Sequence, residues 1–311
     1  MMKLKQILGG LLVVQIVLAC ALYLNSRHAS EFDAQQGLIS VAMAEVDTLL
    51  ITDQDGSVTL QKQGNTWVLP EYGMLSANHT KVTDALSKLE QVKTGWPIAS
   101  SGSSYKRFEL TDTNFQRKVA LFKGEEKLQE VLMGTSPGYR SIHVRRAGEE
   151  DVFSVKLASY DFAAKDIEWL DKALLQIKGI EHIKGADFEV SKNADRWEMA
   201  SSPVVSAAEQ QTKLDGEKVE ELVSFFKNLY VQALFDGNLD AKQKEQRNKK
   251  IAISISAAEQ QLHYEFFVND DSYYVKRSDM ENIFEISKVD YDKISQANLK
   301  YIVTNEQDKD E

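Results

Sequence analysis

The body of this chain repeats one pattern at a spacing of about 130 residues, marked by Trp67 and Trp197. Each tryptophan follows a short strand-like run and a turn, which begins at Gly64 in the first copy and at Ala194 in the second. Such a spacing is too long for a solenoid repeat and is typical of a duplicated domain. The sequence therefore predicts two copies of one folding unit, each containing a strand hairpin.

A helix is predicted after each hairpin, because apolar residues recur there at intervals of three and four positions. Each helix would present one apolar face to a sheet. The two faces consist of Val82, Ala85, Leu86, Leu89 and Val92 in the first copy, and of Val219, Leu222, Val223, Phe226 and Leu229 in the second.

Alternating apolar and polar residues after each helix predict a meander of about four strands, most clearly at 118–122 and 250–255. A short closing helix is expected near 161–175 in the first copy and near 290–301 in the second. The predicted fold class is α+β: two duplicated units, each a largely antiparallel sheet packed with one main helix, after an N-terminal transmembrane helix.

An uncharged apolar stretch extends from Ile7 to Leu24. As a helix it would be about 27 Å long, which nearly matches the hydrocarbon core of a bilayer. Lys3 and Lys5 precede it, and the positive-inside rule then keeps residues 1–6 in the cytoplasm. We therefore expect a single-pass protein of the bacterial inner membrane, with its body in the periplasm or otherwise outside the cytoplasm.

Two alternatives to an uncleaved anchor remain open. The stretch could be a cleaved signal peptide, although no small-x-small cleavage site stands out after it. Cys20 ends a tetrapeptide, Val-Leu-Ala-Cys, that resembles a bacterial lipobox and would make Cys20 a lipidation site. The apolar run continues to Leu24, however, which favours an ordinary residue of a membrane helix.

These features divide the chain into six segments, with enough residues for two separate cores. The segments are a cytoplasmic N-terminus (1–6), a transmembrane anchor (7–24), a linker (25–40), a first α+β unit (41–177), a second α+β unit (178–303) and a disordered acidic tail (304–311).

Composition argues against several classes of function. The net charge of −10 would repel nucleic acid. Cys20 is the only cysteine, so the body can hold neither a disulfide nor a cysteine-based zinc site. The five histidines lack the short spacings of a zinc site, and His143 is expected to be an outward or half-buried strand residue without a catalytic role. We expect no cofactor and no metal.

One literal match to a catalytic motif occurs, because residues 134–138 fit the GxSxG pattern of the hydrolase nucleophile elbow. That elbow needs a helix after the serine and a backbone N–H from the next residue, but Pro137 has no N–H and a strand pattern follows. We therefore interpret Ser136 as part of a plain turn and expect the chain not to be an enzyme.

Paired basic residues stand at equivalent strand ends in the two copies, Arg145 with Arg146 and Lys276 with Arg277. These side chains could bind an anion or the acidic edge of a partner. An ordinary solvated strand rim is the favoured alternative.

Over residues 41–303 the chain resembles a bacterial family of unknown function, DUF4340. The motifs that carry the resemblance are Gly64 to Pro70, Gly134, Tyr139-Arg140, Val144-Arg145, Val152 to Val155, Trp169 to Lys172, Leu174-Leu175 and Trp197. The resemblance implies a membrane-anchored, extracytoplasmic component associated with ABC transporters of the gliding-motility type. It implies no catalytic residues.

We expect a non-enzymatic protein that is an auxiliary or scaffold component of an envelope ABC transporter system. Its partners would be the membrane, transporter subunits or other envelope proteins, and not nucleic acid. One alternative is a membrane-tethered cell-wall hydrolase that uses an acidic pair. Another is an envelope lipid-binding lipoprotein, which would require an acylated Cys20 and a long apolar cavity.

Overall fold

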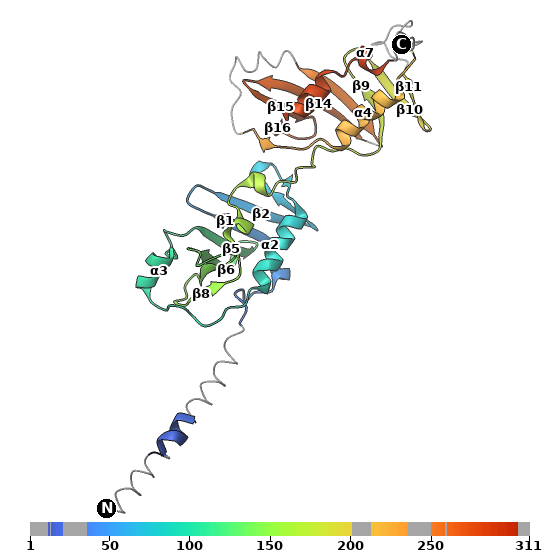
Figure 1. The fold of residues 1–311 in the computed structure, drawn as a ribbon. Coiled ribbons are helices and arrows are strands. Elements are labelled where there is room, and N and C mark those ends of the chain that lie inside the picture. The colour runs from blue at the N-terminus through green and yellow to red at the C-terminus, as the bar shows by residue number, and fades with distance from the viewer. Residues whose placement is uncertain are drawn as a thin grey trace, which may run out of the picture. The chain divides into compact units, whose positions relative to one another are not determined.

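The computed structural model describes residues 12, 14–20, 36–200, 213–235, 250–258 and 260–303. The chain divides into two compact units, residues 1–70 with 77–169 and residues 71–76 with 170–311 (Figure 1). Two eight-stranded sheets with antiparallel pairing form the framework of the described residues, and few helices accompany them. The predicted α+β architecture of two sheet-based units is therefore confirmed.

The first sheet has the strand order β4-β3-β2-β1-β5-β6-β7-β8. Two meanders meet in its middle, where β1 pairs with β5 and Leu49 lies opposite Leu121. Its strands are β1 (Thr48–Thr52), β2 (Ser57–Gln63), β3 (Thr66–Leu69), β4 (Leu75–Ser76), β5 (Arg117–Lys123), β6 (Glu126–Met133), β7 (Ile142–Arg146) and β8 (Val152–Val155).

The second sheet has the strand order β11-β10-β9-β13-β14-β15-β16-β12. Its two meanders meet where β9 pairs with β13, and Ile183 lies opposite Ile255. Its strands are β9 (Ile180–Lys184), β10 (Glu189–Asn193), β11 (Arg196–Met199), β12 (Ala233–Leu234), β13 (Ile251–Ala257), β14 (Gln260–Asn269), β15 (Ser272–Arg277) and β16 (Ile283–Ile286).

The two sheets share the order of seven strands, which confirms the duplication. Trp67 lies opposite Lys62 in the first hairpin, and Trp197 lies opposite Lys192 in the second, so the two hairpins have the same register. The sheets differ in their eighth strand, because β4 extends the β3 edge whereas β12 extends the β16 edge. The sequence analysis missed β1 and β9, the strands that precede each hairpin and join it to the rest of the sheet.

The predicted main helices are α2 (His79–Gln91) and α4 (Gly216–Lys227), each packed against the sheet of its own unit (Figure 1). Both begin at a side-chain cap: Asn78 accepts a hydrogen bond from the Lys81 N–H at 3.0 Å, and Asp215 caps α4 in the same way. Burial of each leucine or phenylalanine on such a face contributes about 1.5–3 kcal/mol. The buried faces are Val82, Ala85, Leu86 and Leu89 on α2, and Val219, Leu222, Val223, Phe225 and Phe226 on α4.

The closing segments of the two units differ. The second unit ends with α6 (Lys288–Ser295) and α7 (Leu299–Ile302), close to the predicted helix. The helix predicted at 161–175 is wrong, because the first unit has only the 3-10 turns η3 (Ser159–Phe162) and η4 (Asp166–Glu168) there. The buried indole of Trp169 donates a hydrogen bond to the Ala163 carbonyl at 2.7 Å and so uses an acceptor that a continuous helix would need. Two further 3-10 turns are η1 (Met43–Glu45) and η2 (Pro70–Tyr72).

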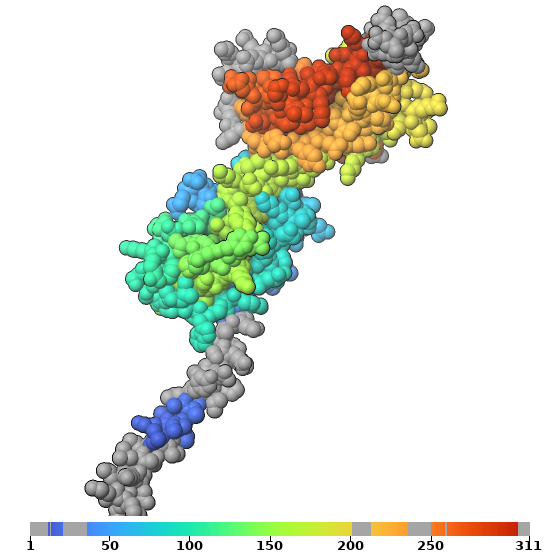
Figure 2. All heavy atoms as spheres, in the orientation of Figure 1, coloured from blue at the N-terminus to red at the C-terminus, as the bar shows by residue number. Residues whose placement is uncertain are grey.

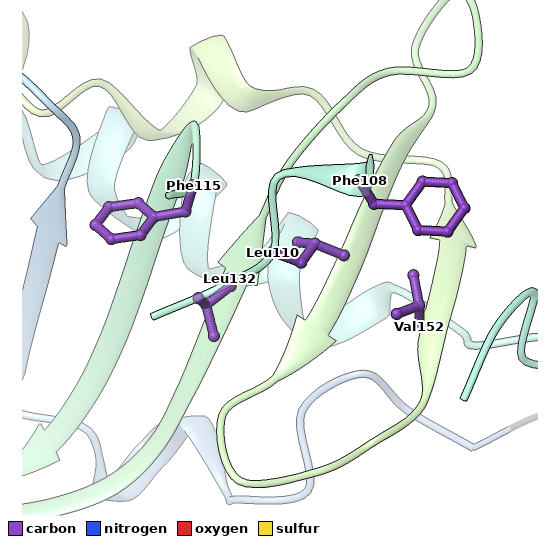
Figure 3. Packing of buried hydrophobic residues seen from close by; sticks show 5 residues of the cluster. All are labelled: Phe108, Leu110, Phe115, Leu132 and Val152. Atoms are coloured by element: carbon purple, nitrogen blue, oxygen red, sulfur yellow. The ribbon is translucent and has the colours of Figure 1, made fainter. Parts of the chain in front are cut away.

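Residues 100–104 look like a flexible serine-rich connector in the sequence, but α3 (Gly102–Phe108) begins within them. Phe108 at the end of α3 packs with Leu110, Phe115, Leu132 and Val152 in a small cluster, and Tyr105 lies partly buried against it (Figure 3). Apolar contacts therefore hold this segment on the sheet, and composition alone does not indicate them.

Residues 14–20 are helical and exposed. The remainder of the predicted anchor, apart from Leu12, lies outside the described residues, as does the predicted acidic tail 304–311. Among the helices that the structure describes, none has the length and apolar character needed to cross a bilayer.

Two hairpin turns use glycine in the first unit and alanine at the matching position of the second. Gly64 has φ 61° and Ala194 has φ 52°, while Gly124 has φ 58° and Ala258 has φ 51°. The left-handed region disfavours residues with a Cβ atom. At these two turns, the second unit therefore carries backbone strain that the first unit avoids.

We expect Ala194→Gly to raise the free energy of unfolding by about 0.5–1 kcal/mol, because it relieves that strain. The matched control, Gly64→Ala, should lower it by a similar amount, since Gly64 has open space around it and only the backbone term changes. Chemical denaturation of the detergent-solubilised chain would measure both. A loss of stability in Ala194→Gly would contradict the strain argument.

Candidate functional site

Arg145 on β7 is buried, with 6% of its surface exposed. Its guanidinium donates hydrogen bonds to the Leu110 carbonyl at 2.9 Å, the Glu149 carbonyl at 3.2 Å and the Asp112 carboxylate at 2.9 Å. It also lies 4.5 Å from the centre of the Tyr105 ring. The expectation of a solvated strand rim is wrong here, because these acceptors replace water around the charge.

Arg277 on β15 plays a similar part in the second unit and is 9% exposed. It forms two hydrogen bonds with the Asp279 carboxylate, at 2.7 and 3.0 Å, and donates a third to the Leu174 carbonyl at 2.9 Å. Burial acts to lower the pKa of Arg277, but the hydrogen bonds and charge of Asp279 together with the interaction with Tyr264 outweigh it and raise that pKa. A solvated rim is again the wrong interpretation.

Arg146 and Lys276 complete the two basic pairs. Arg146 donates to the carbonyls of Leu38 at 2.8 Å and Gly37 at 2.9 Å, and it pairs with Glu149 at 2.8 Å. Lys276 is half-exposed and has no carboxylate partner within the described part of the chain. The structure therefore leaves Lys276 as the basic side chain of the four that is most open to an anion or a partner.

The GxSxG match forms a turn between β6 and β7, as predicted. Ser136 Oγ donates hydrogen bonds to the carbonyls of Gly138 at 2.8 Å and Ser141 at 2.6 Å. A Cβ atom at Gly134 would lie 1.9 Å from the Phe108 carbonyl oxygen, so this position requires glycine. Packing and turn geometry account for the pattern.

His143 is buried on β7, with 9% of its surface exposed, and is not the outward or half-buried residue that we expected. Its Nδ1 lies 2.9 Å from the Thr135 hydroxyl, and its ring packs 4.5 Å from that of Phe108. Burial lowers the pKa of His143, and the charge of Arg107 acts in the same direction. The neutral imidazole is therefore the native form near neutral pH.

Cys20 is exposed and lies within the helical residues 14–20. Its lipidation stays a prediction. In the described ranges, no group of three or more histidine, cysteine and carboxylate side chains is placed to hold a metal ion.

A depression on the first unit has a volume of about 990 Å³. It is lined by α2 and the two positions after it, by the loop before β7, and by β8 and the segment that follows. Figure 2 shows α2, in cyan, beside the yellow-green segment after β8. Segments that are distant in the sequence therefore form one surface.

Basic and aromatic side chains dominate this depression. Lys88 pairs with Asp161 at 2.6 Å. Lys93, Arg140 and Lys156 are exposed, and none of them has a carboxylate partner among the residues that the structure describes. Tyr139 and Tyr160 also line it, with 86% and 68% of their surfaces exposed. We call this surface the basic depression and regard it as the candidate binding site.

A smaller depression of about 360 Å³ lies in the second unit, beside α4, α6 and α7. Tyr301 donates a hydrogen bond to Glu221 at 2.6 Å, and Lys218 pairs with the same carboxylate at 3.0 Å. These two contacts lower the pKa of Glu221, while burial and the bond with Glu221 raise the pKa of Tyr301 to about 12. At neutral pH, Glu221 is therefore ionised and Tyr301 is neutral, as these side chains ordinarily are.

The sequence analysis did not find the basic depression. Its three exposed cations come from separate segments, and no spacing connects them. The only available signal was the Tyr139-Arg140 pair, which belongs to the motifs quoted for the family resemblance.

Arg277→Met should lower the free energy of unfolding by about 2–4 kcal/mol, because it leaves the Leu174 carbonyl and the Asp279 carboxylate without their donor. Lys276→Met is the matched control on the same strand, and it should change that free energy by no more than about 0.5 kcal/mol. Denaturant titration would compare them. Equal effects would show that the bonds of Arg277 do not stabilise the second unit.

The depressed pKa of His143 predicts a specific pH dependence. The unfolded chain protonates this residue near its ordinary pKa of about 6.5, whereas the native state resists protonation, so stability is full above that pH and falls below it. The stability difference between wild type and His143→Phe should therefore shrink from about pH 7.5 to about pH 5.5. Denaturant titrations of both proteins at several pH values would measure this difference, and an equal difference at both ends of the range would contradict the prediction.

Comparison with known protein families gives a match over the middle of the chain. The sequence profile of a family described as Domain of unknown function (DUF4340) matches residues 67–250, from β3 to the position before β13. No curated protein and no solved structure matches the chain. Because the matched region is more than half of the chain, the protein belongs to the DUF4340 family.

Proposed function

We propose that this protein is a non-enzymatic, single-pass membrane protein whose duplicated body works outside the cytoplasm as an auxiliary or scaffold component of an envelope ABC transporter system. The supporting observation is that side chains of the types used in catalysis are instead occupied by hydrogen bonds within the protein. Arg145, Arg277, Ser136 and His143 all make hydrogen bonds within their own unit. These side chains stabilise their own units, and we therefore assign the protein a role in binding rather than in catalysis.

The anchor is part of the proposal. The uncharged stretch from Ile7 to Leu24 has the length that a bilayer requires, and Lys3 and Lys5 precede it. The family resemblance adds the association with ABC transporters. The protein has no phosphate-binding loop of its own in its sequence, so a separate ATPase would supply the energy.

A hydrolase that uses an acidic pair has less support. Such an enzyme needs a carboxyl group with a raised pKa as its general acid. Burial acts to raise the pKa of Asp53, but hydrogen bonds from the N–H groups of Asp55 and Gly56 and the charge of Arg117 lower it. The pKa of Glu221 is also lowered. The lipoprotein alternative has less support too, since exposed charged side chains, Lys93, Arg140 and Lys156, interrupt the apolar lining of the basic depression.

Affinity purification from gently solubilised membranes should recover the full chain together with an ABC ATPase and its permease. The matched control replaces residues 7–24 with a cleavable signal peptide, which exports the body without a tether and should reduce that recovery. A full chain that is purified only as an isolated monomer would contradict the proposal. A reporter fused after Val303 tests the topology separately, since activity in the cytoplasm would place the body on the wrong side of the membrane.

A further inference from the structure

The chain enters the first unit beside the end of α2. Leu38 N–H donates to the Val92 carbonyl at 2.8 Å, and the N–H of Thr94 donates to the Gln36 carbonyl at 2.8 Å. Gly37 lies between these bonds and forms a β-bridge with Lys93. Residues 36–38 are thus fixed to residues 92–94, and the proposed anchor lies N-terminal to them in the sequence.

The basic depression begins at this same place, because Val92 and Lys93 belong to its lining. Arg146 adds to the attachment through its hydrogen bonds with the Gly37 and Leu38 carbonyls. Residues 25–35 separate the predicted span from Gln36, and even a fully extended segment of this length reaches at most about 40 Å. The depression therefore lies at the tethered end of the first unit.

The charge of this end is opposite to that of the whole chain. Lys93, Arg140 and Lys156 contribute exposed positive charge without a carboxylate partner within the described residues, whereas the chain as a whole has a net charge of −10. An acidic body held close to an anionic bilayer is repelled by it. A basic surface beside the tether would instead be attracted to the bilayer.

Exposed apolar and aromatic side chains follow Lys93 in the sequence, and an exposed tyrosine lies within the depression itself. Trp96 is 60% exposed and Ile98 is 45% exposed, in the segment that directly follows Lys93. Tyr139, within the depression, is 86% exposed. Tryptophan and tyrosine favour the interfacial region of a bilayer, where their rings meet hydrocarbon and their polar atoms meet water.

We propose that the basic depression, with Trp96 beside it, binds the phosphate-bearing head groups of anionic phospholipids in the membrane that holds the anchor. Lys93, Arg140 and Lys156 contact the phosphate groups, and Trp96 inserts at the level of the head groups. The inference rests on the proposed anchor, which brings this end of the unit within reach of the bilayer.

The test uses the full chain in nanodiscs of phosphatidylcholine, with or without phosphatidylglycerol, and with brominated acyl chains as quenchers of tryptophan fluorescence. Phosphatidylglycerol should increase the quenching, and added salt should reverse that increase. In a Trp197→Phe background, Trp96→Phe should remove the lipid-dependent part, because the other two tryptophans, Trp67 and Trp169, are buried. Free phosphate cannot produce this signal, since the bromine atoms lie within the bilayer.

The variant with Lys93→Glu, Arg140→Glu and Lys156→Glu should lose the phosphatidylglycerol-dependent quenching. A matched control changes three exposed lysines outside the depression, Lys62, Lys178 and Lys300, to glutamate and should retain it. Circular dichroism would establish that both variants are folded.

Equal quenching with and without phosphatidylglycerol, or unchanged quenching in the depression variant, would overturn the lipid site while leaving the anchor intact. A chain that fails to enter the nanodiscs would instead overturn the anchor, and the lipid site with it. If the depression variant loses a co-purifying envelope protein but keeps its lipid-dependent quenching, the surface serves a protein and the proposal is wrong.

Discussion

Each unit depends on one long-range strand pairing, between β1 and β5 in the first sheet and between β9 and β13 in the second. The two meanders on either side are too small to be stable alone, and the helix that separates them in the sequence has no sheet to cover until they join. Leu49 with Leu121, and Ile183 with Ile255, are almost completely buried at the junctions. Burial of these apolar pairs offsets the entropy lost when the intervening chain is closed into a loop.

The duplication preserved the backbone more strictly than the polar contacts. Both units bury an arginine near the end of β7 or β15, but at positions that are one residue apart: Arg145 lies opposite Leu132, whereas Arg277, the counterpart of Arg146, lies opposite Tyr264. Each buried arginine finds a backbone carbonyl from a segment outside the sheet, and each has its own aspartate. A buried guanidinium is costly without such acceptors, so each unit depends on the local segments that supply them.

The sequence predicted the elements whose signal is local. The tryptophan hairpins, α2 and α4 follow from short local patterns. The first strand of each unit was missed because its central place in the sheet depends on a distant partner, β5 for β1 and β13 for β9, although the Asp55-Gly56 turn between β1 and β2 was a local signal. The basic depression was missed for a related reason: Lys93, Arg140 and Lys156 come together only when β7, β8 and α2 pack.

If the chain is anchored as proposed, the tether joins the first unit beside the basic depression, where Arg146 and Thr94 hold the chain at Gln36 to Leu38. Attraction of the basic depression to an anionic bilayer and repulsion of the remaining acidic surface would then turn the unit in the same direction. That arrangement would orient the unit without a second membrane span and would leave its acidic surface facing away from the lipid, open to a partner.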